Sequence, residues 1–283
     1  MKQTYYSSGY SLSEIANFAA DLAKRAGDIV LNERLQATYE TSFKSNEELV
    51  TSADVKVDEY ISEHILNHYP GHQILSEEGM HDFAQLTECN TPLWVVDPID
   101  GTVNFAYGHN QVAVSIAYFE RGEVKAGVVF APFQNELFMA VRGQYAVMNH
   151  QAIRVSGQTD FRQALLATGF PYHKNTVGQL IGRLQAVLSE CRDIRRIGSA
   201  ALDICWVAMG RLDGYYESLS PWDFAAAQLI AREAGARCGR LHPAPAEIPE
   251  ELFGEDIIIT SPAIYNHLKT LLAEADSCLP GKR

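Results

Sequence analysis

The sequence predicts a layered α+β fold with mixed and antiparallel sheets. Amphipathic helical patterns occur near both ends of the chain, and a run of β-branched and alternating segments from 111 to 141 is typical of an antiparallel meander. Short apolar segments elsewhere alternate with helical patterns. Because no linker, low-complexity run or internal repeat divides the 283 residues, we expect one domain over 1–275 and a C-terminal tail over 276–283.

Two helices are predicted in the N-terminal part. Ser11 and Glu14 have the spacing of a capping box, and they precede an apolar stripe with helical periodicity: Ile15, Phe18, Leu22, Ala26 and Ile29. A second helix is expected from about Ala53 to Tyr69, because Pro70 and Gly71 then end it.

The remaining elements follow from periodicity and from turn residues. We expect a meander of three strands at 112–118, 124–130 and 136–141. After it we expect, in order, a helix at 177–189, a strand at 193–196, a helix at 199–210, a strand at 212–217, a helix at 221–234, a strand at 257–259 and a helix at 262–275.

The segment from Trp94 to Asn104 carries the first functional signal. An apolar strand runs into Asp97 and Asp100, which are spaced i, i+3. Since Pro98 cannot donate to a strand ladder, we expect both aspartates on a tight turn just beyond the strand. Oxygen ligands of this kind bind Mg²⁺ together with substrate phosphate. The alternative is an ordinary Asp-Pro and Asp-Gly turn that caps a helix.

Four further carboxylates lie at ends of predicted elements. Glu77 follows the short apolar strand 73–75, so it is expected beside Asp97 at a neighbouring strand end. Asp54 and Asp223 fall in the first turns of predicted helices, where a carboxylate also serves as a cap or complements the helix dipole. Glu217, at the end of a predicted strand, would by default be a solvated loop residue.

Composition restricts the class of protein. The formal charge of −12 and the pI near 5.2 disfavour a surface for nucleic acid or anionic membrane, because both require clustered Lys and Arg. Five cysteines without C-x-x-C spacing indicate reduced thiols, and the scattered histidines lack the grouping of a closed zinc site. No signal peptide or long apolar run is evident, so a cytoplasmic location without membrane contact is expected.

Several short motifs in a fixed order make the chain resemble the inositol monophosphatase family of Mg²⁺-dependent, lithium-sensitive phosphatases. The central motif is DPIDGTVN over 97–104. Around it stand LVTSAD over 49–54, SEEG over 76–79, GFPY over 169–172, RIGSAALD over 196–203 and PWD over 221–223. Together these motifs cover most of the chain.

The resemblance implies a five-layered αβαβα arrangement and two or three Mg²⁺ ions. It implies one ion held by Glu77, Asp97 and the Ile99 carbonyl, and a second held by Asp97, Asp100 and Asp223. Asp54 and Thr102 would activate the attacking water together with the metal ligand Glu77. The resemblance also suggests substrate contacts at Gly101, Thr102, Gly198, Ser199, Ala200 and Glu217, and further roles for Lys44 and Glu78 near the metals.

Three hypotheses on function follow. The first is hydrolysis of a small phosphorylated polyol, most of all myo-inositol 1-phosphate, by a homodimer of this chain. The second is the same reaction on fructose 1,6-bisphosphate, histidinol phosphate or a nucleotide-derived phosphate. The third is a regulatory role through a protein of the transcription machinery, because the 195–203 and 221–226 segments look most like bacterial members of the family. Direct nucleic-acid binding is not expected.

Overall fold

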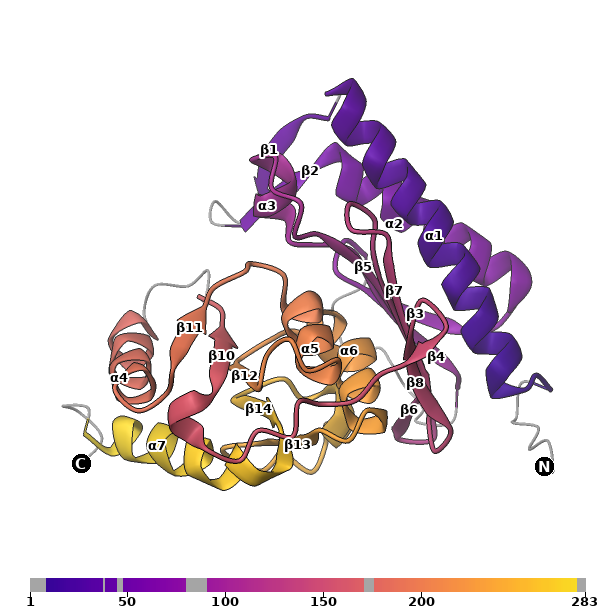
Figure 1. The fold of residues 1–283 in the computed structure, drawn as a ribbon. Helices are drawn as coiled ribbons and strands as arrows, with labels where there is room; N and C mark the ends of the chain where they lie inside the picture. Colours follow the sequence, from indigo (N-terminus) through magenta and orange to yellow (C-terminus); the bar gives the residue numbers. More distant parts are fainter. Residues whose placement is uncertain (1–8, 38, 45–47, 80–90, 171–175, 279–283) are drawn as a thin grey trace.

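The computed structural model describes residues 9–37, 39–44, 48–79, 91–170 and 176–278, without the side chains of 43, 44 and 48. These residues form five layers, in which two sheets alternate with three layers of helices (Figure 1). Three clusters of buried apolar side chains fill the spaces between the layers. The predicted αβαβα fold is confirmed.

Helices α1 (Leu12–Gln36) and α2 (Ser52–His68) form the first layer. The capping box of α1 is present, with the backbone N–H of Glu14 donating to the Ser11 hydroxyl at 3.3 Å. The predicted apolar stripe of α1 packs on the first sheet. A small two-stranded sheet of β1 (Thr41–Lys44) and β2 (Glu48–Thr51) leads into α2; the sequence analysis did not include it.

The first sheet has seven strands in the order of the sequence. They are β3 (Gln73–Ser76), β4 (Leu93–Asp100), β5 (Ala113–Glu120), β6 (Glu123–Ala131), β7 (Glu136–Val141), β8 (Tyr145–Met148) and β9 (Gln151–Ala152). From β4 onward each strand is antiparallel to the next, which confirms the predicted meander. The pair β3 and β4 is parallel.

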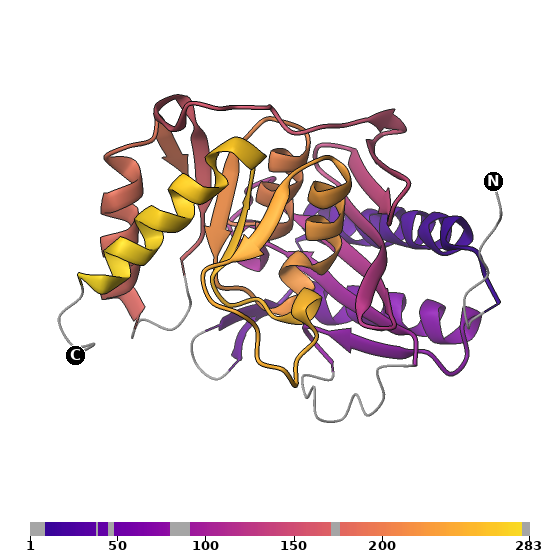
Figure 2. The ribbon, with the colours of Figure 1, turned by 90° about the horizontal axis from the view of Figure 1, so that it is seen from below.

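The central layer consists of α5 (Ala200–Ala208) and α6 (Pro221–Glu233), which lie between the two sheets (Figures 1 and 2). The second sheet has the order β11-β10-β12-β14-β13. Its strands are β10 (Leu165–Thr168), β11 (Asp193–Arg195), β12 (Gly214–Glu217), β13 (Arg237–Arg240) and β14 (Ile257–Thr260). Its outer face carries α4 (Val177–Leu188) and α7 (Tyr265–Ser277).

One prediction about β4 is wrong. The strand does not stop before Asp97 but continues to Asp100, with an irregular register against β5 between the two aspartates. Pro98 lies in this irregularity, where its missing N–H leaves no ladder bond unmade. The Ile99 N–H donates instead to Asp97 Oδ1 at 3.0 Å. The two carboxylates are therefore fixed by the strand itself and not by the predicted tight turn beyond it.

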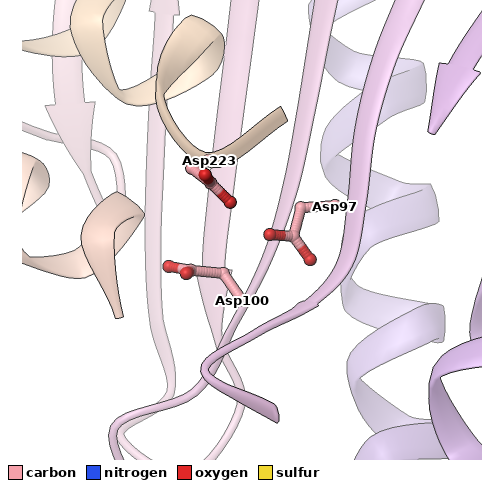
Figure 3. A group of neighbouring side chains, drawn as sticks. All are labelled: Asp97, Asp100 and Asp223. Carbon is pink, nitrogen blue, oxygen red and sulfur yellow. The ribbon is translucent and has the colours of Figure 1, made fainter. Parts of the chain in front are cut away.

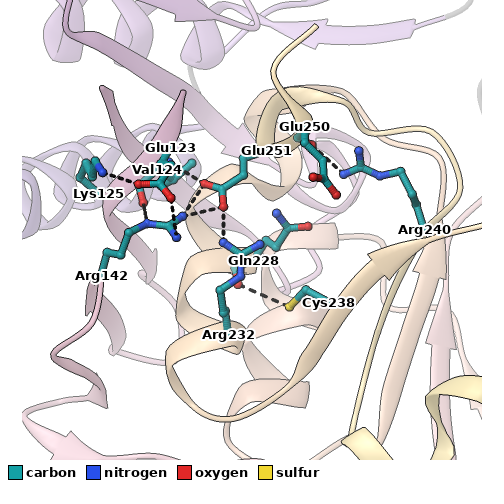
Figure 4. A network of polar contacts seen from close by, with 10 residues as sticks. All are labelled: Glu123, Val124, Lys125, Arg142, Gln228, Arg232, Cys238, Arg240, Glu250 and Glu251. Atoms are coloured by element: carbon teal, nitrogen blue, oxygen red, sulfur yellow. Dashed lines mark hydrogen bonds and ion pairs between the residues drawn. The ribbon is translucent and has the colours of Figure 1, made fainter. Parts of the chain in front are cut away.

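An ion-pair network joins the first sheet to the loop before β14 (Figure 4). Glu251, in the short 3₁₀ helix Glu250–Leu252, accepts hydrogen bonds from Arg142 at 2.6 Å and from Arg232 of α6. Its other oxygen accepts from the Val124 N–H of β6 at 2.6 Å. This network ties α6 of the central layer to β6 and to Arg142, the residue that follows β7.

Among the described residues, the helices are too short or too polar to cross a membrane.

Candidate active site

Three aspartates from two distant segments meet between the first sheet and the central layer. Asp97 and Asp100 come from the end of β4, and Asp223 comes from the first turn of α6 (Figure 3). One carboxylate oxygen of each lies within 4.8 Å of the others. Asp97 is 1% exposed and Asp100 7% exposed. Three such groups in one buried place repel one another unless a cation or protons lie between them.

The acidity of these groups reflects that repulsion. Burial, followed by the charges of Glu77, Asp100 and Asp223, raises the pKa of Asp97 well above its ordinary range. Burial also raises the pKa of Asp100 to about 6, although hydrogen bonds from Ser199 and from the backbone of α5 oppose the shift. A site of this kind exchanges protons for cations readily, because metal binding requires the ionised ligands.

Glu77 is brought to Asp97 by the pairing of β3 with β4. The Glu77 N–H donates to the Val96 carbonyl at 3.2 Å, immediately beyond the parallel register of the two strands. The side chains of Glu77 and Asp97 share a hydrogen bond, which contributes to the raised pKa of Asp97. The predicted neighbourhood of these two carboxylates is confirmed. Glu78 is half-buried, and the prediction for the Lys44 side chain lies outside the described residues.

Asp54 and Thr102 form a hydrogen-bonded pair. The Thr102 hydroxyl lies 2.9 Å from Asp54 Oδ1 and 3.1 Å from the Ile99 carbonyl oxygen. The other oxygen of Asp54 accepts from the Thr51 N–H at 2.8 Å and from the Thr51 hydroxyl at 2.5 Å, which completes a capping box at the start of α2. Burial raises the pKa of Asp54 to about 6 despite these hydrogen bonds.

Asp100 is held by the start of α5. It accepts hydrogen bonds from the Ser199 hydroxyl at 2.5 Å, the Ala201 N–H at 2.8 Å and the Ala200 N–H at 3.2 Å. The predicted substrate contacts Ser199 and Ala200 thus also orient a carboxylate of the acidic group. The adjacent Gly101 has φ of 99°, and an added Cβ would lie 2.8 Å from the Gln111 carbonyl oxygen, so only glycine fits there.

A cavity of about 80 Å³ opens beside the acidic group. Its walls include the predicted residues Asp100, Gly101, Gly198, Ser199, Ala200, Glu217 and Asp223. Burial raises the pKa of Glu217 to about 7, while hydrogen bonds from Tyr215 and the Gly169 backbone and the charge of Arg196 lower it. The structure therefore places the carboxyl groups of Asp100, Asp223 and Glu217 around one space.

Six further residues of this cavity were not assigned roles from the sequence: Gly169, Phe170, Arg196, Asp203, Tyr215 and Leu219. Gly169 follows β10, a strand that the sequence analysis did not predict. Asp203 is on α5 and Tyr215 is on β12. Both lie within apolar segments of the sequence, where a core position is the ordinary interpretation. The i, i+2 spacing of Tyr215 and Glu217 on a strand was the available signal, since it places both side chains on one face.

The donor set fits divalent, oxygen-ligated cations. The described part of the chain groups carboxylates here without cysteine or histidine, which suits Mg²⁺ rather than a softer metal. Burial raises the pKa of both Asp97 and Asp100, and at Asp97 the charges of neighbouring carboxylates add to the shift; a bound cation would relieve both effects.

Comparisons with known proteins agree with this geometry. Residues 11–277 match a family model described as the inositol monophosphatase family. The Nus factor SuhB of Vibrio cholerae is 41% identical over 223 residues, which cover 78% of this chain and 82% of that protein. A solved extragenic suppressor protein suhB from Bartonella henselae has a TM-score of 0.83 and 32% identity, covering 92% of this chain and 98% of the other. A solved inositol monophosphatase from Anabaena has a TM-score of 0.78 and 31% identity, covering 93% and 96%.

Proposed function

Because the chain belongs to the inositol monophosphatase family, we propose that it hydrolyses a phosphorylated polyol, with myo-inositol 1-phosphate as the main substrate and Mg²⁺ as cofactor. Family membership supports metal-dependent hydrolysis of a phosphomonoester. The observation that carries the finer proposal is the cavity in which Asp100 and Asp223 share one space with Glu217. The carboxylate group suits a metal-bound phosphate, and Glu217 suits a hydroxyl of the leaving group.

The proposed ligands are those that the family resemblance implies, and the proximity of the Asp97, Asp100 and Asp223 carboxylates supports them. Glu77, Asp97 and the Ile99 carbonyl would hold one Mg²⁺, and Asp97 would share a second with Asp100 and Asp223. A third, weaker ion near Glu77 and Glu78 is part of the proposal. Bound there, the ions would neutralise charge on the phosphate and lower the pKa of the attacking water.

The chain itself would orient the water and take up its proton. The Thr102 hydroxyl has one proton, which it donates either to Asp54 Oδ1 or to the Ile99 carbonyl. When it donates to Asp54, its oxygen lone pairs accept a hydrogen bond from the water. The proton can then pass along Thr102 to Asp54, whose other oxygen stays fixed by Thr51. The amides at Gly101 and Thr102, at the start of α3 (Thr102–Ala106), lack helical acceptors and would bind the phosphate.

A panel of phosphomonoesters tests the substrate. With Mg²⁺, we expect kcat/KM for myo-inositol 1-phosphate to exceed that for fructose 1,6-bisphosphate, histidinol phosphate and a nucleotide 3′-phosphate. A higher value on any of these would identify the substrate as that ester instead. Release of phosphate from none of them would refute the proposal.

A second candidate function comes from the name of a relative. The protein from Vibrio cholerae is called a Nus factor, which favours a role with the transcription machinery through a protein partner. Gel filtration of the chain with purified bacterial RNA polymerase and Nus proteins tests this role. An Asp97→Asn variant that co-elutes but has lost turnover would separate the two functions; no co-elution with wild type would refute the second.

A further inference from the structure

Asp203 is a buried carboxyl group that the proposed reaction leaves unused. It lies in the first turn of α5, where the helix dipole favours a negative charge. Its side chain lines the active-site cavity although the residue is only 1% exposed. Among the described residues, its Oδ1 has no hydrogen-bond partner. A buried polar atom without a partner is costly, so this oxygen requires an explanation.

The neighbouring carboxylate of Glu217 is, by contrast, well held. The Tyr215 hydroxyl donates to it from the same face of β12, and the Gly169 N–H donates to it from the end of β10. A Cβ on Gly169 would lie 2.0 Å from the Glu217 carboxylate. The absence of a side chain at Gly169 therefore lets Glu217 rest against the backbone in one orientation.

Asp203 and Glu217 face the same space from two elements. Each contributes to the electrostatic environment that raises the pKa of Tyr215, and the charge of Arg196 acts on both. Asp100 and Asp223, which belong to the acidic group, line the same cavity. A ligand whose phosphate lies at the acidic group would therefore meet both Asp203 and Glu217 with its other end.

A carboxyl group in such a place, ionised or protonated, has an oxygen that accepts hydrogen bonds from hydroxyl groups. We propose that Asp203 accepts a hydrogen bond from a second hydroxyl of the leaving group, so that the site selects polyols that present one hydroxyl to Glu217 and another to Asp203. This inference rests on the proposed phosphatase function and specifies its substrate class. A monohydroxy ester, or an aryl ester, can satisfy at most one of the two carboxyl groups.

Kinetics on two substrates test the inference. We would measure kcat/KM with Mg²⁺ for myo-inositol 1-phosphate and for 4-nitrophenyl phosphate, using wild type, Asp203→Asn, Glu217→Gln and the double variant. Asp21→Asn, a substitution at an exposed side chain on α1, is the matched control. Asp203→Asn should lower kcat/KM for inositol phosphate by about tenfold, and the aryl ester by less than about twofold. The double variant should be slower on inositol phosphate than either single variant, although the two losses need not multiply because the groups interact.

Three outcomes would overturn the inference. Equal losses on both substrates would mean that Asp203 serves the fold or the metal ligands. A double variant no slower than Glu217→Gln would mean that Asp203 acts only through Glu217. If Asp203→Asn hydrolyses inositol phosphate at the wild-type rate, Asp203 does not contact the substrate, but the proposed phosphatase function stands. If the wild-type protein hydrolyses neither ester, both the proposed function and this inference are refuted.

A set of singly deoxygenated inositol 1-phosphates keeps the test decisive if a variant fails to fold. With wild-type protein, two ring positions should be sensitive: removing the hydroxyl at one of them, or at the other, should lower kcat/KM by about tenfold. Sensitivity at a single position would overturn the proposal.

Discussion

Replacing Asp97 by asparagine should abolish most of the turnover and, without divalent ions, stabilise the protein. Asparagine keeps the shape of the side chain, and its oxygen can still accept the hydrogen bond from the Ile99 N–H. The amide nitrogen can donate to Glu77, which shares a hydrogen bond with Asp97. What the substitution removes is one negative charge from the group of Asp97, Asp100 and Asp223.

The direction of the stabilisation follows from the pKa of Asp97, which burial and then neighbouring charge raise well above its ordinary range. An acid whose pKa is raised in the folded state destabilises that state as pH rises from its ordinary pKa to the raised one. Removing the acid should therefore stabilise the ion-free protein at neutral pH. One pKa unit corresponds to about 1.4 kcal/mol, and a change of about 1 kcal/mol moves the Tm of a chain of this size by roughly 2 °C or more.

Thermal unfolding in EDTA at several pH values measures this effect. The difference between Asp97→Asn and wild type should be smallest below about pH 3, where Asp97 is protonated in both the folded and the unfolded state, and should grow toward neutral pH. In saturating Mg²⁺ the order should reverse, since only wild type gains the full binding energy, and kcat should fall at least about 10²-fold. A lower Tm for the variant in EDTA at pH 7.5, or near-normal turnover in Mg²⁺, would refute the assignment of Asp97.

Three further predictions address the base, the ions and the scaffold. Because the pKa of Asp54 is raised to about 6, kcat/KM at saturating Mg²⁺ should rise between pH 5 and 7, and Asp54→Asn should be slow throughout; an unchanged profile in the variant would assign the titration elsewhere. Lithium should inhibit uncompetitively or noncompetitively, and indifference to tens of millimolar, an order-of-magnitude choice far above a typical KM, would contradict a readily exchanged second metal. Glu251→Gln removes the carboxylate that Arg142 and Arg232 share and leaves Arg142 with only Glu123, at 3.6 Å, so it should lower stability by about 2 kcal/mol, seen as a lower Tm with unchanged kcat; a lower kcat at equal Tm would contradict a purely structural network.

The fold was predictable where a sequence pattern has one physical interpretation. The capping box before α1 and the alternating strands of the meander each specify their element locally. Short strands are different. β10 and β13, of four residues each, have no distinctive periodicity, and they are strands because neighbours in the second sheet pair with them. The order of the layers likewise depends on which faces pack together, and it came from family resemblance.

The acidic part of the site was predictable because its residues stand at the ends of elements, in motifs that can be recognised. Asp203 belongs to the RIGSAALD motif but, like Tyr215, was given no role from the sequence. Asp203 lies in the first turn of an apolar helix and Tyr215 in the interior of a strand, and both positions suit an ordinary core. Only the meeting of α5 with β12 turns them into walls of a cavity. Pro98 misled the prediction of β4, because an irregular register can include a proline inside a strand.

The sequence left two interpretations open for each aspartate, helix capping or catalysis, and the structure shows that capping is present at three of them. Asp54 completes the capping box of α2, Asp223 completes that of α6, and Asp100 accepts from the first amides of α5. Capping fixes the direction of a carboxylate while leaving lone pairs for another ligand. The two roles therefore support each other. It also follows that alanine substitutions here would remove the cap together with the charge, whereas asparagine removes the charge and keeps one of the two acceptor oxygens.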